Sequence, residues 1–245
     1  MSTTCIILAA GRGSRLKPLT DSTPKPLLEV GGVTLIEYNL QKLSLIADKF
    51  IIVTNYLEDL IQSRIGHIFN GKKVEYVHQT SSTGGTLDAF RTGVYGSIDF
   101  EKNSNYLISN SDDLHGSDIY QQFELSIGSQ PEFALVSAKI LEDKEKLKNY
   151  GVLEVDNDNI LLKVWEKPRH YVSSLVNTGI YYFPFTVLDF LHSETDLTLG
   201  REEYITEDLF NPYSRKHPIK VLSTKGSWLP ISTVHDLNTA VLPKN

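Results

Sequence analysis

The first half of the chain alternates continuous apolar runs with amphipathic segments. The runs predict buried strands at residues 4–10, 50–54, 74–78 and 106–109. Apolar residues at helical intervals predict helices that open at Thr34, near Thr86 and at Ser117, with Ser117 as a cap. Glu37 completes a capping box with Thr34. This alternation favours an α/β fold with a mostly parallel sheet and helices on both faces.

The second half of the chain carries a different pattern. Two strand-like segments, residues 151–156 and 160–167, flank the turn-forming Asn157-Asp158-Asn159 and predict a β-hairpin. Further elements are expected as strands at 177–183 and 219–223 and a last helix at 233–241. That helix would turn Val234, Leu237 and Val241 inward. With no linker and no hexapeptide repeat in view, we expect one domain over residues 1–245 without a C-terminal β-helix.

Composition narrows the classes of partner. Hydrophobic residues make up 40% and charged residues 22% of the chain, which is typical of a globular protein that builds a sizeable core. The net charge is −6 and no Lys/Arg block could follow a nucleic-acid backbone, so a nucleic-acid partner is disfavoured. The single cysteine, Cys5, excludes a disulfide framework. The short apolar run at residues 4–10 resembles neither a signal peptide nor a membrane span, and we expect a cytoplasmic protein.

The residues with the clearest chemistry follow the first predicted strand. Gly11 and Gly13 allow backbone N–H groups to approach a phosphate, and Arg15 and Lys25 add positive charge beside them. The glycine pair alone would favour an ordinary strand-to-helix turn. Leu16 breaks the dinucleotide fingerprint G-x-G-x-x-G, and the segment has no GK[ST] of a P-loop. If this segment binds a nucleotide, it must form a loop of a different type from these two.

The segment Gly11-Arg12-Gly13-Ser14-Arg15-Leu16, followed by Pro24-Lys25, resembles the signature of sugar-1-phosphate nucleotidylyltransferases, the nucleotide-sugar pyrophosphorylases. The resemblance continues along almost the whole chain in the order of that family's motifs. The matching segments are Gln79 with residues 85–90, residues 106–112, 149–152, 166–168, 177–181 and 228–237. It implies a Rossmann-like three-layer α/β/α fold with a mixed, mostly parallel sheet, in which residues of about 1–135 bind the nucleotide and 136–245 the sugar.

The resemblance also implies roles for individual residues. Nucleotide contacts would come from Leu8, Ala10, Gly11, Gly13, Ser14, Gln79, Gly85 and Thr86. Arg15, Lys25 and Asp112 would be catalytic, and Asp112 would hold Mg²⁺. The sugar phosphate would be bound by Gly151, Glu166, Lys167 and Asn177. Without the motifs, Asp112 and Asp113 could equally cap a helix or end a strand, and Glu166 could be a solvated hairpin residue.

Two departures from the family pattern affect the metal site. Ser111 replaces the glycine that precedes the metal-binding aspartate. Pro230 stands where the family has a second metal-binding aspartate, and proline offers no side-chain oxygen. Asp112 would then bind Mg²⁺ with phosphates and water, with Asp113 as a candidate second ligand.

These features favour transfer of a nucleotidyl group from a nucleoside triphosphate to a sugar 1-phosphate, with release of pyrophosphate. Gln79 with Gly85 favours UTP or dTTP, since a carboxamide can pair with the donor and acceptor edge of a pyrimidine. Two alternatives remain at this point: cytidylyl transfer to a phosphorylated alcohol such as phosphocholine, and a non-catalytic regulatory homologue that binds nucleotide sugar. A homo-oligomer is compatible with all three, and no membrane partner is expected.

Overall fold

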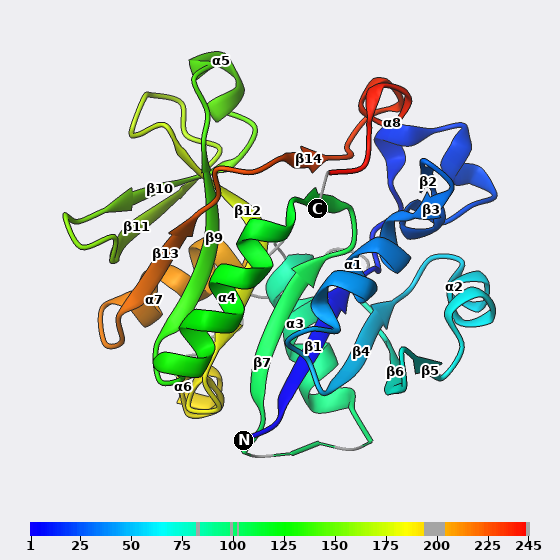
Figure 1. The fold of residues 1–245 in the computed structure, drawn as a ribbon, viewed down its shortest axis with the longest axis horizontal. Helices are drawn as coiled ribbons and strands as arrows, with labels where there is room; N and C mark the ends of the chain where they lie inside the picture. Colours follow the sequence, from blue (N-terminus) through cyan, green and yellow to red (C-terminus); the bar gives the residue numbers. More distant parts are fainter. Residues whose placement is uncertain (82–83, 99, 102, 194–203, 244–245) are drawn as a thin grey trace.

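The computed structural model describes residues 1–81, 84–98, 100–101, 103–193 and 204–243. Within them, one ten-stranded sheet runs through the protein in the order β11-β10-β12-β7-β1-β4-β6-β5, and β9 pairs with both β12 and β13 (Figure 1). Its strands are β1 (Thr3–Leu8), β4 (Lys49–Thr54), β5 (Ile68–Phe69), β6 (Lys72–His78), β7 (Asn105–Asn110), β9 (Ala134–Ile140), β10 (Gly151–Val155), β11 (Leu161–Glu166), β12 (Leu175–Phe183) and β13 (Ile219–Ser223).

The sheet is mixed, and its parallel part lies in the first half of the chain. Strand β1 pairs in parallel with β4 and β7, β4 with β6, and β9 with β13. Strand β12 joins this part to the β10–β11 hairpin through antiparallel pairs. The predicted α/β fold, with a mixed and mostly parallel sheet, is confirmed.

Helices cover both faces of the sheet. They are α1 (Leu35–Leu43), α2 (Glu58–Ile65), α3 (Gly85–Gly96), α4 (Ser117–Ser129), α5 (Lys144–Leu147), α6 (Val187–Ser193), α7 (Asn211–Ser214), α8 (Val234–Thr239) and a π-helix, η4 (Ile205–Phe210). On β1, Ile6 faces the core beneath α3 and η4, whereas Cys5 and Ile7 face the core beneath α1 and α4. Both faces of the strand are buried, which explains its unbroken apolar run.

Most predicted elements are present with shifted ends, and three details of the prediction were wrong. The first strand ends at Leu8, two residues early, where the chain turns into the glycine loop. Ser117 is the first residue of α4 rather than its cap, since Gly116 takes that position without a side-chain bond. Val241 lies beyond the end of α8 and is 74% exposed. The capping box of Thr34 and Glu37 is confirmed.

Smaller elements hold the first loop against the end of the chain. Strands β2 (Glu29–Val30) and β3 (Val33–Thr34) form one two-stranded sheet, and β8 (Asp113–His115) and β14 (Trp228–Pro230) form another. Leu16, from the loop that follows β1, shares an apolar cluster with Ile231 and with Leu237 of α8. Residues near both ends of the chain therefore build one side of the molecule (Figure 1).

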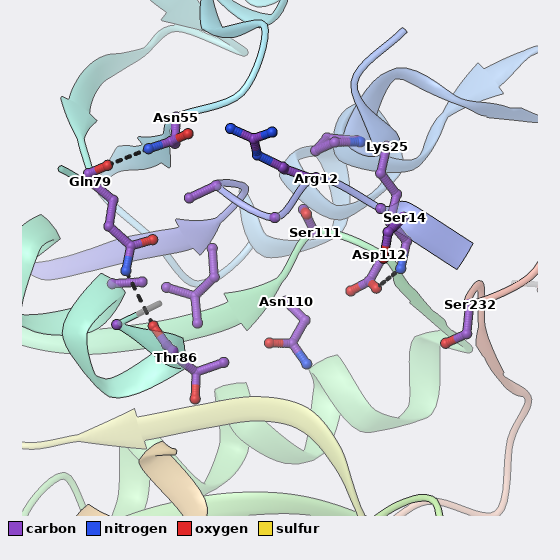
Figure 2. A pocket seen from close by; sticks show the side chains of 18 of the residues that line it. Arg12, Ser14, Lys25, Asn55, Gln79, Thr86, Asn110, Ser111, Asp112 and Ser232 are labelled. Carbon is purple, nitrogen blue, oxygen red and sulfur yellow. Dashed lines mark hydrogen bonds and ion pairs between the residues drawn. The ribbon is translucent and has the colours of Figure 1, made fainter. Parts of the chain in front are cut away.

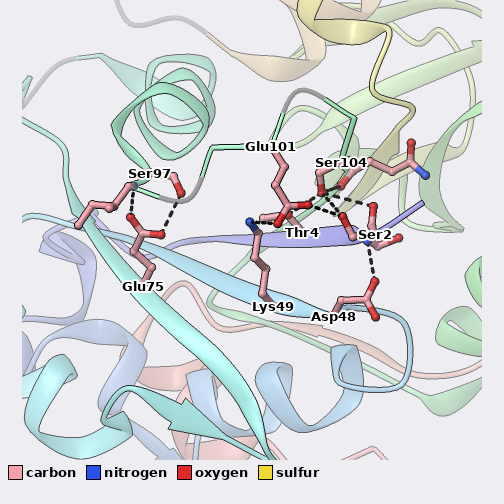
Figure 3. A network of polar contacts seen from close by, with 11 residues as sticks. Ser2, Thr4, Asp48, Lys49, Glu75, Ser97, Glu101 and Ser104 are labelled. Carbon is pink, nitrogen blue, oxygen red and sulfur yellow. Dashed lines mark hydrogen bonds and ion pairs between the residues drawn. The ribbon is translucent and has the colours of Figure 1, made fainter.

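A polar network ties the amino ends of the strands together (Figure 3). Glu101 accepts hydrogen bonds from Ser2 Oγ at 2.8 Å and Lys49 Nζ at 2.9 Å. Asp48 Oδ2 accepts one from the backbone N–H of Thr3 at 2.7 Å. These contacts lie at the sheet edge opposite the carboxyl ends of the parallel strands, so they serve the packing of the strands.

No helix among the described residues is both long and apolar enough to cross a membrane.

Replacing Gly93 with alanine is expected to destabilise the fold. A Cβ at Gly93 would lie 2.9 Å from Ile6 Cγ2 and 3.0 Å from Val53 Cγ2, where α3 meets the sheet. Such overpacking costs about 1–3 kcal/mol of unfolding free energy, measured by urea denaturation. Gly128→Ala in α4 is the matched control, since a Cβ there meets no atom within 4 Å. An equal loss in both variants would contradict the packing argument.

Candidate active site

Two adjoining pockets open at the carboxyl ends of the parallel strands. The loop pocket, with a volume of about 420 Å³, is lined by the glycine loop, the start of α3 and the residues that follow β7. The hairpin pocket, of about 660 Å³, is lined by the β10–β11 hairpin, β12, η4 and β14. Arg15, Thr86, Asn110, Asp112 and Ser232 line both. Ligands in open α/β sheets bind at this edge.

The glycine loop packs closely against Lys25 at the wall of the loop pocket. Gly13 has a φ of 62°, and a Cβ there would lie 3.0 Å from Lys25 Cβ and 3.1 Å from Thr20 Cγ2. The absence of that Cβ lets Lys25 fold against the loop, and Thr20 Oγ1 secures the turn by donating to the carbonyl of Gly13 at 3.0 Å. A Cβ at Gly11 would meet no protein atom within 4 Å, so its bare Cα leaves space in the pocket.

Lys25 and Asp112 form an ion pair where the two pockets meet (Figure 2). The Lys25 side chain is 12% exposed and that of Asp112 is 29% exposed. Asp112 comes shortly after β7, the parallel strand that also pairs with β12, so this strand leads a carboxylate to the junction. The pairing shows that this carboxylate already attracts a cation in the folded protein.

Asp113 lies deeper than its neighbour and has protein partners on both oxygens. Oδ1 accepts a hydrogen bond from Trp228 Nε1 and Oδ2 one from Asn110 Nδ2, each at 3.0 Å. Burial, and then the charge of Asp112, raise the pKa of Asp113 to about 7. Gly179, with a φ of 87°, leaves room for this cluster, because a Cβ there would lie 2.6 Å from Asp113 Oδ2.

The hairpin pocket gathers the residues predicted to bind a sugar phosphate. Glu166 ends β11, and its Oε2 accepts a hydrogen bond from Thr206 Oγ1 of η4 at 3.1 Å. Lys167 has a φ of 46°, and its Nζ lies over the ring of Tyr204 at 5.0 Å. The pairing of β12 with β9 shifts register between Asn177 and Tyr181, an irregularity of the kind that redirects side chains at sites.

The structure brings every predicted site residue to one of these pockets. The loop pocket is lined by Leu8, Ala10, Gly11, Gly13, Ser14, Arg15, Lys25, Gln79, Gly85, Thr86 and Asp112. The hairpin pocket is lined by Gly151, Glu166, Lys167 and Asn177, together with Asp113 and Pro230. Pro230 pairs with Asp113 across the small β8–β14 sheet. In the described part of the chain, no three His, Cys, Asp or Glu side chains come together as a ready metal site.

The residues that line the loop pocket but were given no role from the sequence include Arg12, Asn55, Asn110 and Ser232. Asn55 and Asn110 stand at or directly after the carboxyl ends of β4 and β7, a position that could have identified both. Arg12 lies inside the glycine loop, with its guanidinium 5.5 Å from the ring centre of Tyr56. No comparable signal marks Ser232, which reaches the pocket from the far end of the chain.

The sequence is similar to those of known proteins along nearly its whole length. The pattern of the nucleotidyl transferase family matches residues 4–242. The chain is 30% identical over 240 residues to the bifunctional protein GlmU of Methanococcus aeolicus, covering 97% of this chain and 54% of that protein. It is 25% identical over 188 residues to the UTP–glucose-1-phosphate uridylyltransferase AglF of Haloferax volcanii, covering 76% and 74% of the two chains. The chain thus spans about half the length of the bifunctional relative.

Solved structures give the same result. A Bacillus anthracis protein assigned as a glucose-1-phosphate thymidylyltransferase, in complex with sucrose, matches with a TM-score of 0.83 at 28% identity, over 97% of this chain and 93% of that chain. A UDP-glucose pyrophosphorylase complexed with UDP-glucose matches with a TM-score of 0.82 at 21% identity, over 97% and 96%, which supports the fold alone. The fold and the match along nearly the whole sequence lead to one conclusion: the chain belongs to the nucleotidyl transferase family.

Proposed function

We propose that this protein transfers a nucleotidyl group from a nucleoside triphosphate, with UTP or dTTP favoured, to a sugar 1-phosphate and releases pyrophosphate. The observation that carries the proposal is Asp112 at the junction of two pockets, one lined by the glycine loop and the other by Glu166, Lys167 and Asn177. One relative is named as a uridylyltransferase and another is assigned as a thymidylyltransferase, and both names support the choice of base.

The chemistry needs alignment and charge neutralisation rather than a covalent nucleophile. An oxygen of the sugar phosphate attacks the α-phosphorus, a new P–O bond forms, and the bond to the β-phosphate breaks. Arg15 would stabilise the departing pyrophosphate and Lys25 the phosphates at the reacting centre. Lys167 would hold the attacking phosphate from the hairpin pocket. The pockets adjoin, so the two anionic substrates can be aligned side by side.

Asp112 fits the proposed Mg²⁺ because its carboxylate lies at the junction and already pairs with the cationic Lys25. Pro230 offers no oxygen, and both oxygens of Asp113 accept hydrogen bonds from protein donors. We therefore propose Asp112 as the protein ligand, with phosphate oxygens and water completing the shell, as is usual for Mg²⁺. The bound ion would neutralise charge on the phosphates.

The hairpin pocket favours a sugar over phosphocholine as the acceptor. Glu166 supplies a carboxylate beside Asn177, and such a pair can bond vicinal hydroxyl groups, which phosphocholine lacks. The hydrogen bond from Thr206 leaves Glu166 fixed at the pocket wall.

A matrix of five nucleoside triphosphates against common sugar 1-phosphates, scored by pyrophosphate release with Mg²⁺, tests the proposal. We expect turnover with UTP or dTTP and a hexose 1-phosphate. Turnover only with CTP and phosphocholine would favour the cytidylyltransferase. Tight binding of nucleotide sugar without pyrophosphate release in any combination would favour the regulatory homologue.

Glu166→Gln should raise the KM for the sugar 1-phosphate about tenfold, the effect of weakening one charge-assisted hydrogen bond. The KM for the triphosphate should stay unchanged, since Glu166 lines only the hairpin pocket. Steady-state kinetics with each substrate varied in turn measures both. Glu154→Gln, at an exposed position of the same hairpin, is the control. A parallel rise of both KM values would contradict the assignment.

A further inference from the structure

The side chain of Gln79 is held firmly at the wall of the loop pocket. Gln79 follows β6 and is 6% exposed. Its backbone N–H donates to the carbonyl of Thr54 at 2.8 Å, and its backbone carbonyl accepts from Asn55 Nδ2 at 2.6 Å. The side-chain nitrogen, Nε2, donates to Asp88 Oδ2 at 2.7 Å and to the carbonyl of Gly85 at 3.3 Å. Both the backbone and the side chain of Gln79 are therefore anchored.

These partners fix which end of the amide faces the pocket. Carboxylate and carbonyl oxygens only accept hydrogen bonds, so the atom of Gln79 that meets Asp88 and Gly85 must be the nitrogen. Turning the amide over would place its oxygen against the Asp88 and Gly85 oxygens, where no hydrogen bond can form. Both N–H groups are thus used within the protein. The amide oxygen, an acceptor, is the atom left for a ligand, and Figure 2 shows it on the opposite side of the amide from the nitrogen, which is turned towards the start of α3.

The position of Asp88 depends on the start of α3. Asp88 lies in the first turn of this helix, where a carboxylate is favoured by the helix dipole. Its side chain folds back over Gly84, and a Cβ at Gly84 would lie 2.1 Å from Asp88 Oδ2. The bare Cα of Gly84 therefore provides the space from which Asp88 reaches Gln79.

We propose that Asp88 is a positioning residue that sets the base preference of the loop pocket by holding Gln79 as a hydrogen-bond acceptor. An acceptor at this point attracts bases that carry an N–H on the ring, namely uracil, thymine and guanine. Cytosine and adenine present a lone pair at the equivalent ring nitrogen and are repelled. The first N–H groups of α3, which have no partner within the helix, can meet the carbonyl oxygens that flank such a ring N–H. The inference rests on the proposed function, in which this pocket takes the base of the triphosphate.

Asp88→Asn tests the proposal with little change in shape. An asparagine can present an NH₂ group to the Gln79 oxygen, so only the longer contact with the Gly85 carbonyl, at 3.3 Å, then opposes the turned-over amide. The probes are UTP and CTP, with their dissociation constants measured by calorimetry. We expect the preference for UTP over CTP to fall about tenfold, the effect of one hydrogen bond. Asp88→Ala, which removes the shorter of the two hydrogen bonds that hold the nitrogen, should change the ratio in the same direction.

Two controls separate positioning from general damage. Asp59→Asn removes a carboxylate from the first turn of α2, outside both pockets, and should leave the ratio unchanged. In a Gln79→Leu background, Asp88→Asn should cause no further change, because Asp88 acts through the glutamine amide. An unchanged ratio in Asp88→Asn, or an equal loss of affinity for both nucleotides, would overturn the proposal. So would a wild-type protein that binds UTP and CTP equally well.

The dissociation constants of the nucleotides and the rate of pyrophosphate release are measured in separate experiments. If the wild-type protein releases no pyrophosphate with any acceptor, the proposed function fails. The ratio of UTP to CTP binding still decides the role of Asp88 in that case.

Discussion

Asp112→Asn should lower the rate of pyrophosphate release by about 100-fold or more at saturating Mg²⁺. Losing one preorganised electrostatic contact to the reacting phosphates typically has an effect of this size. The substitution keeps the size of the side chain and removes its charge. Pro230 offers no side-chain oxygen and Asp113 is engaged by Asn110 and Trp228, so neither is expected to replace it. Lys25 also loses its ion-pair partner.

Single-turnover measurement of pyrophosphate release over a range of Mg²⁺ concentrations gives the effect directly. Asp59→Asn, a change of the same chemistry at an exposed position of α2, should keep the wild-type rate. UTP binding measured without Mg²⁺ should persist in Asp112→Asn, because the glycine loop and Gln79 remain. Full turnover in this variant would remove Asp112 from the metal site.

The fold should lose up to about 3 kcal/mol of unfolding free energy through His115 as the pH falls from 6.5 to 4. His115 is completely buried in β8, and its Nε2 contacts the carbonyl of Thr178 at 2.8 Å. Burial lowers the pKa of His115 from 6.5 to about 4. Between these two values the unfolded chain binds a proton that the folded protein does not, so stability rises with pH across this window and is lost on acidification.

Urea denaturation at pH 7 and at pH 4.5 measures this loss. Acidic side chains also contribute to unfolding at low pH, so the variant His115→Gln isolates the histidine. Glutamine can donate to Thr178 in its place and does not titrate, and the variant should show a smaller difference between the two pH values. His235→Gln, at an exposed position in α8, should behave like the wild-type protein. Equal pH dependence in His115→Gln and the wild type would contradict the assignment.

The strands of the first half could be predicted because their burial is complete on both faces. Residues 50–54, for example, contain no polar side chain before Thr54, so an apolar run was sufficient evidence. Strand β9 escaped prediction although it forms the most extensive pairing with β12. Its run contains Ser137, which is fully buried. That hydroxyl contacts Thr178 Oγ1 at 2.7 Å and the backbone N–H of Ile180 at 2.9 Å. Both partners lie some forty residues away in the sequence, so the local pattern around Ser137 could not predict them.

The candidate site divides in a similar way. Its side chains could be named from motifs, because phosphate and sugar chemistry require particular residue types after particular strands. The contacts that surround these side chains could not be predicted from the sequence. The hydrogen bond from Trp228 to Asp113 joins positions separated by 115 residues, and the one from Thr206 to Glu166 comes from a π-helix that no periodicity predicted. These contacts decide that Asp113 and Glu166 are held by donors from distant parts of the chain.

The antiparallel ladder between β7 and β12 limits how the molecule can move. Ser109 of β7 pairs with Ile180 of β12, so the strand that leads to Asp112 is bonded to the strand that carries Asn177. The two halves cannot swing apart on a hinge without breaking main-chain hydrogen bonds at the centre of the sheet. Ligands must therefore enter and leave at the rim, where the glycine loop, η4 and the segment around Ser232 border the opening. The backbone beneath keeps the loop pocket and the hairpin pocket at a fixed separation.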